Sequence, residues 1–155
     1  MTILITYTIA HGLIAHRLGA PESEEGILFK ATRADQMIAF CAGLKFIGPE
    51  TKFKAQSTYG SGESYEEGQR ILQTLQAMDH IVITHVLQDN MATALIDGQP
   101  IFKHHKAAEY FLVCAAIQQT EPDKVSHVFP KNVPLPLMEA FRQGEVAARL
   151  AATEY

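Results

Sequence analysis

The chain has 155 residues, of which 47% are hydrophobic and 19% are charged, and its formal net charge is −4 at pH 7. This length is typical of one domain that buries enough surface to fold without a disulfide or metal staple. The acidic balance argues against a general nucleic-acid-binding protein, because such proteins carry basic surfaces.

The two cysteines, Cys41 and Cys114, both lie within apolar helical patterns. Such positions are typical of buried, reduced thiols in a reducing compartment, although the sequence leaves a bond between them open. The N-terminus lacks the basic start and the small-residue cleavage site of a signal peptide. The apolar run 110–117 is too short for a bilayer, which needs roughly 20 residues. We therefore expect a cytoplasmic protein with no membrane partner.

The chain begins with a strand pattern. The segment 2–9 places isoleucines and Tyr7 opposite threonines, and this period of two predicts a strand with one buried face. Residues 10–18 predict a short helix that ends at Gly19, and residues 27–31 predict a second strand.

Two helices and an edge strand follow. Thr32 and Asp35 resemble a capping box before a helical apolar pattern, which a Gly-Pro pair ends. Residues 52–58 alternate weakly between apolar residues and lysines, as in a solvent-facing or edge strand. Ser64 and Glu67 form a second capping box, which predicts the start of an amphipathic helix.

The second half of the chain predicts a hairpin. Residues 80–87 are nearly continuously apolar, as in a central strand. Asp97-Gly98 is a strong signal for a two-residue turn between strands at 91–96 and 99–103. Pro100 places the return strand at a sheet edge. Two further elements close the chain: a short strand over 125–129 and a helix from about 137 to 152.

The stretch 104–119 begins with basic residues and is wholly apolar from Tyr110 to Ile117. A helix that is apolar on every side is normally buried at the centre of a domain. We therefore predict a single α+β domain over residues 1–155. In it, a mixed or antiparallel sheet of five to seven short strands packs with about four helices around a buried central helix, 104–119. One subunit has few layers with which to cover such a helix, so we also expect a homo-oligomer.

Four basic residues, Lys103, His104, His105 and Lys106, crowd the first turn of this helix. Exposed N–H groups at a helix start favour anions, whereas cations there oppose the macrodipole unless a counter-charge lies near. The cluster predicts a binding site for phosphate, a nucleotide or a carboxylate. The alternative is a solvated basic turn.

A Gly-rich connection over residues 59–63 precedes the amphipathic helix. Such loops can cradle phosphates through backbone N–H groups, but neither the P-loop nor the Rossmann spacing is present and glutamates follow. We expect Tyr59, Ser61 and Tyr65 to form a lid over a neighbouring ligand site. The alternative is a flexible loop without a ligand.

A metal site is a further possibility, because His105 and Glu109 are four residues apart and share one helix face. His80 or His85, on the neighbouring strand, would complete a histidine and carboxylate ligand set of the kind that suits zinc and other divalent ions. The alternative is a contact between His105 and Glu109 alone. The sequence identifies no cofactor.

Two strand-borne histidines, His85 and His127, lie among apolar neighbours, within the similar tetrapeptides 84–87 and 126–129. If they converge in a cleft, they could act as acid and base in phosphodiester cleavage. The pair resembles the tandem His-x-Ser/Thr tetrapeptides of the 2H phosphoesterases, although the hydroxyl residues Thr84 and Ser126 here precede the histidines. The alternative is that each is a hydrogen-bonded core histidine. An internal duplication would explain the similarity between the two tetrapeptides, and the alternative is chance matching.

The sequence is compatible with three classes of function. The first is a small cytoplasmic protein that binds a compact anion, a nucleotide or another phosphate-containing metabolite, at the basic turn. The second is a histidine-dependent phosphoester hydrolase that uses His85 and His127, with or without a metal. The third is a homo-oligomeric structural or interaction subunit that has no ligand. The sequence leaves open whether the protein is an enzyme.

Overall fold

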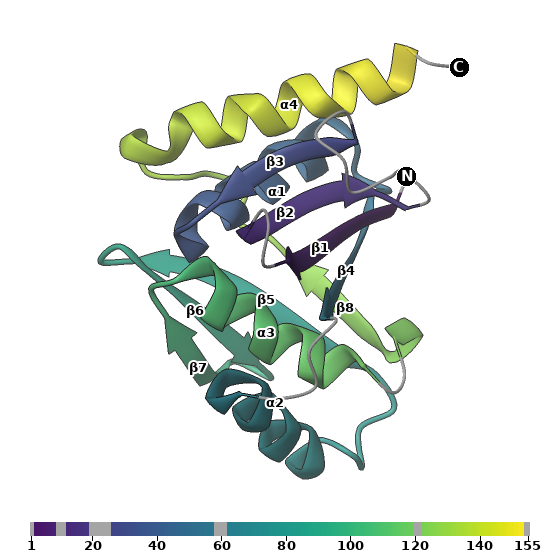
Figure 1. Cartoon of the computed structure of the whole chain (residues 1–155), viewed down its shortest axis with the longest axis vertical. Helices are drawn as coiled ribbons and strands as arrows, with labels where there is room; N and C mark the ends of the chain where they lie inside the picture. The colour runs from purple at the N-terminus through teal and green to yellow at the C-terminus, as the bar shows by residue number, and fades with distance from the viewer. Residues whose placement is uncertain (1, 9–11, 19–25, 58–61, 120–121, 154–155) are drawn as a thin grey trace.

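The computed structural model describes residues 2–8, 12–18, 26–57, 62–119 and 122–153 (Figure 1). These ranges contain eight strands: β1 (Thr2–Thr8), β2 (Gly12–Arg17), β3 (Ile27–Ala31), β4 (Lys52–Ser57), β5 (Ile81–Gln88), β6 (Met91–Ile96), β7 (Gln99–His104) and β8 (Val125–Val128). The α-helices are α1 (Ala34–Ile47), α2 (Glu63–Thr74), α3 (Ala107–Gln118) and α4 (Met138–Thr153), and 3₁₀ turns cover Pro122–Lys124 and Leu135–Leu137.

The described strands form two four-stranded sheets, in the orders β3-β2-β1-β4 and β7-β6-β5-β8. In chain order, the first three strands of each sheet pair antiparallel to one another. The last strand pairs in parallel with the first, β4 with β1 and β8 with β5. The predicted α+β class with four helices is confirmed, but the prediction of one sheet with five to seven strands was wrong. Strand patterns alone do not tell which strands pair, and here each closing strand returns through a helix to its own hairpin.

The two sheets belong to two copies of one unit, β-β-β-α-β-α, which we call repeat 1 (residues 2–74) and repeat 2 (residues 81–153). The repeats meet symmetrically at the starts of α1 and α3. Ala34 N–H donates to the His105 carbonyl over 3.0 Å, and Ala107 N–H donates to the Thr32 carbonyl over 2.9 Å. Ala34 and Ala107 occupy equivalent positions in the two repeats, and so do Thr32 and His105. The two hydrogen bonds are therefore related by symmetry, which places a pseudo-twofold axis between the two helix starts.

The amino-acid sequence carries the same relation. Residues 29–44 align without a gap with residues 102–117, and five positions are identical: Phe29 and Phe102, Lys30 and Lys103, Ala34 and Ala107, Cys41 and Cys114, and Ala42 and Ala115. The pairing of the second strand with the third is also interrupted by a bulge at the same point of each sheet. The register shifts after Ala15 in the β2–β3 pair and after Ala94 in the β6–β7 pair. The similar tetrapeptides noted in the sequence, in contrast, lie on β5 and β8 of one sheet and do not correspond under this symmetry.

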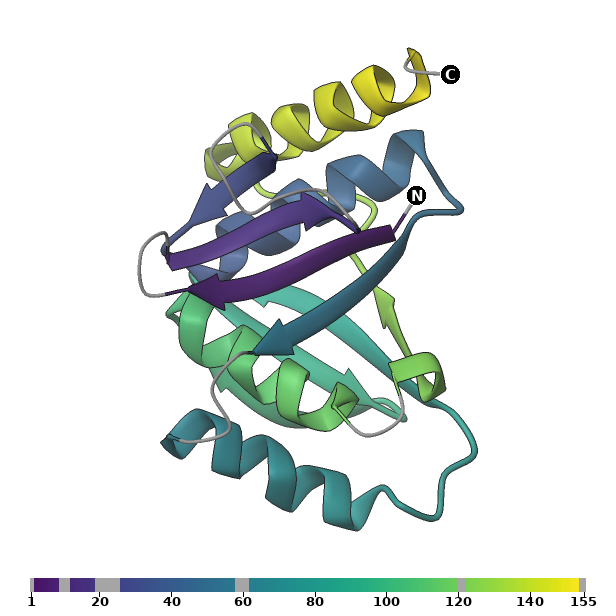
Figure 2. The same cartoon turned by 45° about the vertical axis from the view of Figure 1, so that its right-hand side comes forward.

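The last helix of each repeat packs on the inner helix of the other: α4 lies along α1, and α2 lies along α3 (Figures 1 and 2). Both crossings depend on a glycine. A side chain at Gly144 would collide with the carbonyl of Phe40, and one at Gly68 would collide with the carbonyl of Val113. Phe40 and Val113 are themselves equivalent in the alignment, so the close helix contacts obey the pseudo-twofold relation as well.

The predicted central helix needs a correction. Its segment 104–119 is helical only from Ala107 to Gln118, because His104 ends β7. The centre is also shared, since α1 is as buried as α3 and one hydrophobic cluster includes residues of both helices and both sheets. Strands of both sheets and α2 cover α3 within one chain. A second subunit is therefore not needed to cover α3, and the homo-oligomer stays a prediction.

One predicted helix is a strand, whereas the predicted hairpin turn and edge strand form as expected. Residues 10 and 11 of the predicted helix 10–18 lie outside the described residues, and Gly12–Arg17 form strand β2, where a short apolar run is buried between two neighbouring strands. Such a run has no period that separates a helix from a strand. The tight turn is confirmed, since Asp97 and Gly98 have φ values of 53° and 77°. Pro100 lies in the edge strand β7, as predicted.

Neither predicted capping box forms. The N-cap residues of α1 and α2 are Arg33 and Gly62, and neither helix start has a side-chain cap. Asp35 instead pairs with Arg33 over 2.5 Å. None of the described helices is both long and apolar enough to cross a membrane.

Candidate functional site

A chain of hydrogen bonds between polar side chains runs through the core of repeat 2. The Tyr110 hydroxyl lies 2.7 Å from His85 Nδ1, and His85 Nε2 lies 2.9 Å from His127 Nδ1. His127 Nε2 then lies 3.1 Å from Gln118 Oε1, which also accepts from the backbone N–H of Ala55 over 2.8 Å. The chain thus joins β5, β8 and α3 of repeat 2 to β4 of repeat 1.

When both imidazoles are neutral, the last contact fixes the direction of every hydrogen bond. The Ala55 N–H can only donate, so the Gln118 atom that faces it is the carbonyl oxygen, and His127 must donate to that oxygen through Nε2–H. His127 Nδ1 is then an acceptor for His85 Nε2–H, and His85 Nδ1 accepts from the Tyr110 hydroxyl. With both imidazoles neutral, each is therefore protonated at Nε2.

Burial favours the same protonation state. Desolvation lowers the pKa of His127 to about 4. It also lowers the pKa of His85 well below its usual value, and the neighbouring His127 lowers it further. Burial raises the pKa of Tyr110 well above 10, so the phenol keeps its proton. The network is a set of neutral donors and acceptors whose outermost imidazole donor, His127 Nε2–H, is directed at Gln118.

The pseudo-twofold relation shows that packing alone does not require these polar groups. Strand register and the helix alignment make Ile5 the counterpart of His85, Met37 that of Tyr110, and Phe53 that of His127. All three counterparts are buried apolar side chains. The same positions in the same unit are therefore filled by an apolar core in repeat 1. Buried polar groups are costly unless they are fully bonded, so their presence in repeat 2 favours a role beyond packing.

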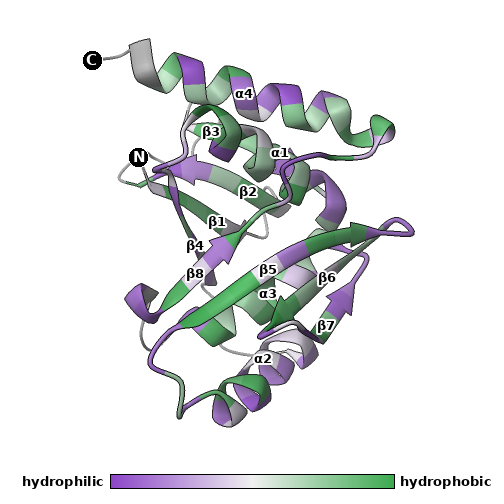
Figure 3. Ribbon diagram, turned by 180° about the vertical axis from the view of Figure 1, so that it is seen from behind, coloured by the Kyte–Doolittle hydropathy of each residue, from purple (hydrophilic) through white to green (hydrophobic). Residues whose placement is uncertain are grey.

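A pocket of about 280 Å³ opens beside this network, between β4 and β8, which lie side by side (Figures 1 and 3). Four pairs of equivalent residues line it: Lys45 and Gln118, Thr51 and Val125, Lys52 and Ser126, and Phe53 and His127, together with Lys54 and Asp123. Each repeat thus supplies one wall, and the pocket lies at the pseudo-twofold axis.

The pocket lining is positively charged, although the whole chain has a net charge of −4. The lining has three positive side chains, Lys45, Lys52 and Lys54, and one negative side chain, Asp123. His127 is neutral. Asp123 is fully exposed and lies 3.8 Å from the Lys54 ammonium, and an exposed ion pair of this length contributes little. The Lys45 ammonium donates to the Thr51 carbonyl over 3.1 Å. Three ammonium groups beside imidazole and amide groups make a site suited to an anion.

The structure disperses the basic turn predicted as an anion site. The Lys103 and Lys106 side chains are exposed, and the backbone of Lys106 forms an isolated antiparallel β-bridge with that of Arg33. His105 Nδ1 bonds to the Asn90 carbonyl over 2.9 Å. His104 faces carboxylates of the chain itself: it lies 2.7 Å from Glu67 and 3.4 Å from Glu109, in a pocket that also includes Glu63 and Glu66.

The predicted metal ligands do not come together. Glu109 contacts His104 while His105 turns to Asn90, His80 lies 2.7 Å from the Ser126 hydroxyl, and His85 is within the core network. Within the described ranges, no group of three or more His, Cys, Asp or Glu side chains is placed to hold a metal ion.

Of the three predicted lid residues, Tyr59 and Ser61 fall outside the described part of the chain. Tyr65 lies on α2, is buried, and its hydroxyl donates to the side chain of Gln119. It lines a second pocket of about 220 Å³ that shares Lys54 and Gln118 with the first.

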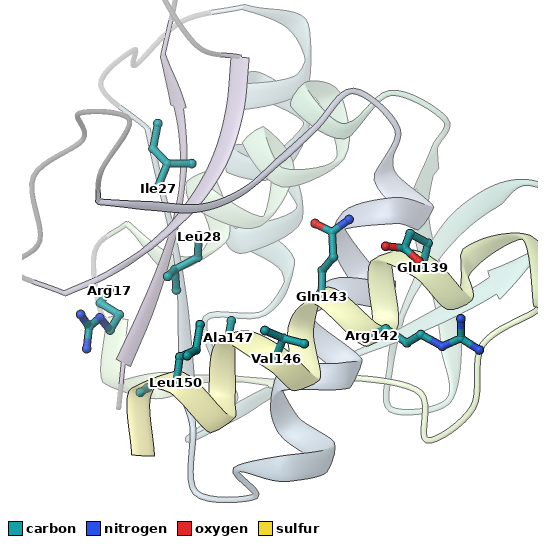
Figure 4. Close-up of a pocket in the computed structure, with 10 residues that line it drawn as sticks. Arg17, Ile27, Leu28, Glu139, Arg142, Gln143, Val146, Ala147 and Leu150 are labelled. Carbon is teal, nitrogen blue, oxygen red and sulfur yellow. The ribbon is translucent and has the colours of Figure 1, made fainter. Parts of the chain in front are cut away.

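A larger pocket of about 490 Å³ lies between β3 and α4, but its lining does not form a chemical site (Figure 4). Arg17 and Arg142 lie at opposite ends of it, separated by apolar side chains such as Leu28 and Ala147. Size alone therefore does not identify the functional site, and the pocket at the axis is the better candidate.

The sequence had singled out His85 and His127 but not the residues around them. The sequence pattern places Gln118 and Lys45 at the ends of two helices and Lys54 in an edge strand. None of these patterns marks a functional residue. The gapless alignment of residues 29–44 with 102–117 was the available signal, because extending it pairs Lys45 with Gln118.

The fold and the site define an α+β protein of two pseudo-symmetric units with a basic pocket on their common axis. Comparison with known proteins finds no matching family, no matching curated protein and no matching solved structure.

Proposed function

We propose that this protein binds a compact anion, most simply a small phosphate-containing metabolite, in the pocket between β4 and β8. The proposal depends on one observation: three lysines line a pocket together with His127, the last histidine of the buried hydrogen-bond network. Residues of both repeats form this pocket. A volume of about 280 Å³ lies just below the usual range for ligand pockets, roughly 300–1,000 Å³. This size favours a phosphate group or a small phosphomonoester over a complete nucleotide.

The test is a thermal-shift and calorimetric titration with inorganic phosphate and with adenosine monophosphate at low ionic strength, where charge interactions are least screened. We expect phosphate to raise the melting temperature of the wild-type protein more than the nucleotide does. The double variant Lys52→Ala/Lys54→Ala should lose this shift. The matched control, Lys103→Ala/Lys106→Ala, removes the same charge from the basic turn and should keep it.

The two double variants also decide between the two sites. Loss of binding only in the Lys103→Ala/Lys106→Ala protein would return the anion site to the basic turn at the start of α3. Absence of a phosphate effect in the wild-type protein and in both variants would refute the binding of free phosphate by the wild-type protein and would favour a structural or interaction subunit.

A phosphoester hydrolase is the second candidate, favoured by the direct contact between His85 and His127. In the bonded arrangement His127 Nε2–H is a donor, and its Nδ1 lone pair is taken by His85. Because a neutral imidazole is a poor acid, His127 Nε2–H would serve as a hydrogen-bond donor that stabilises charge on the ester, while water attacks phosphorus and its proton passes to the leaving oxygen. Turnover of a p-nitrophenyl phosphate ester that His127→Asn abolishes and that Lys103→Ala/Lys106→Ala leaves unchanged would establish this activity. No turnover by the wild-type protein would leave binding as the function.

The expected cytoplasmic location accords with two buried free thiols, Cys41 and Cys114, which a reducing compartment keeps unpaired. Homo-oligomerisation remains a separate expectation. Analytical ultracentrifugation at micromolar concentration tests it, and a monomer would exclude it.

A further inference from the structure

The oxygen of the Gln118 side chain sits where two donors converge. Ala55 N–H and His127 Nε2–H reach it over 2.8 Å and 3.1 Å, and the Gln118 side chain is almost completely buried. The donors come from β4 and β8, one in each repeat, while Gln118 is the last residue of α3. One acceptor atom thus satisfies a polar group from each half of the molecule.

Both donors are held in place independently of Gln118. The Ala55 backbone is fixed by the parallel pairing of β4 with β1, and the His127 imidazole is oriented by the bond from His85 Nε2–H. Two preorganised N–H donors that point at one oxygen are the arrangement by which enzymes and binding proteins hold an oxyanion. An anionic oxygen would accept both bonds more strongly than a neutral amide does.

The Gln118 side chain also stands between two cavities. It lines the pocket of about 280 Å³ and the pocket of about 220 Å³, and Lys54 lines both as well. If the amide moves aside, the two spaces join, and the two freed donors face the combined cavity beside the Lys54 ammonium.

We infer that Gln118 is an internal plug whose amide oxygen occupies the place of one oxygen of an anionic ligand, a phosphomonoester or a carboxylate. The bound ligand would displace the amide, accept from Ala55 N–H and His127 Nε2–H, and place its remaining charge near Lys54. This inference rests on the proposed function for the class of ligand, but it adds the atoms that hold the ligand and the residue that competes with it.

The experiment measures phosphate affinity by calorimetry in the wild-type protein, Gln118→Ala and Gln118→Asn, with folding checked by circular dichroism. Alanine removes the competing oxygen and asparagine draws it back by one methylene, so each should bind phosphate about tenfold more tightly than the wild-type protein. Asparagine keeps a polar side chain and serves if alanine prevents folding. Gln73→Ala, at an exposed position of α2, is the matched control and should bind like the wild-type protein.

Amide NMR locates the ligand. In Gln118→Ala, phosphate should shift the ¹H–¹⁵N resonance of Ala55, whereas a merely structural role for Gln118 predicts no such shift. Equal affinity in the wild-type protein and both variants, abolished by Lys52→Ala/Lys54→Ala, would overturn the plug and leave the proposed function standing. Absence of phosphate binding in all of these proteins would overturn the proposed function and the plug with it. Binding that appears only in the Gln118 variants would support the plug and show that the wild-type site is closed to free phosphate.

Discussion

Two neutral histidines in the core should make the protein sensitive to mild acid. An unfolded histidine has a pKa near 6.5, whereas burial lowers the pKa of His127 to about 4 in the folded protein. Between these values the unfolded chain binds a proton that the folded chain does not, so stability falls as the pH falls. From pH 7 to pH 5 the loss due to His127 is about 2 kcal/mol, since each pH unit below 6.5 costs about 1.4 kcal/mol. His85, whose pKa is lowered by burial and then by His127, adds a loss of the same sign.

Urea unfolding at pH 7 and pH 5 measures this loss. His127→Asn keeps an acceptor for His85 Nε2–H but no longer titrates, so its loss of unfolding free energy between the two pH values should be smaller by about 2 kcal/mol. The control His105→Gln changes an exposed histidine and should behave like the wild-type protein. Equal pH dependence in the wild-type protein and His127→Asn would show that His127 is not a buried neutral imidazole, and the derived hydrogen-bond directions would then fail.

Three further predictions test the fold. Gly68→Ala and Gly144→Ala should each lower the free energy of unfolding in urea by about 1–3 kcal/mol, because the added methyl group meets a helix backbone. Cys41 and Cys114 should react with an aromatic disulfide reagent only after unfolding, since burial raises the pKa of both thiols. Gly98→Ala should cost about 1–2 kcal/mol in the same urea assay, because Gly98 has a φ of 77°.

Local patterns predicted most elements of this chain, and they failed where tertiary context decides. The segment 12–17 is an inner strand whose apolar residues are buried without a clear period, so it resembled a helix. The polar residues near the starts of α1 and α2 resembled caps. Asp35 instead forms an ion pair with Arg33, and Glu67 contacts His104. A capping motif predicts a helix start only if no stronger partner lies nearby in the fold.

The division into two sheets was beyond the reach of strand patterns, because it depends on which hairpin each closing strand joins. The repeat could have been found from the sequence, since residues 29–44 and 102–117 align without a gap. The candidate site could be found only in part. Its histidines are conspicuous in sequence, but the Gln118 side chain reaches the Ala55 backbone across 63 positions of the chain, and no local pattern records that contact.

The asymmetry of the two repeats bears on the orientation of a bound ligand. A symmetric pocket on a twofold axis would present the same groups from both sides and could accept a ligand in two orientations. Here the equivalents of Gln118 and His127 are Lys45 and Phe53, so one wall offers an ammonium and an aromatic ring where the other offers an amide and an imidazole. A ligand that requires both the donors and the ammonium groups fits in one orientation only. In the proposed site an anion would therefore bind in a single orientation, with its donor-bound oxygen facing Ala55 and His127 and its remaining charge facing the lysines.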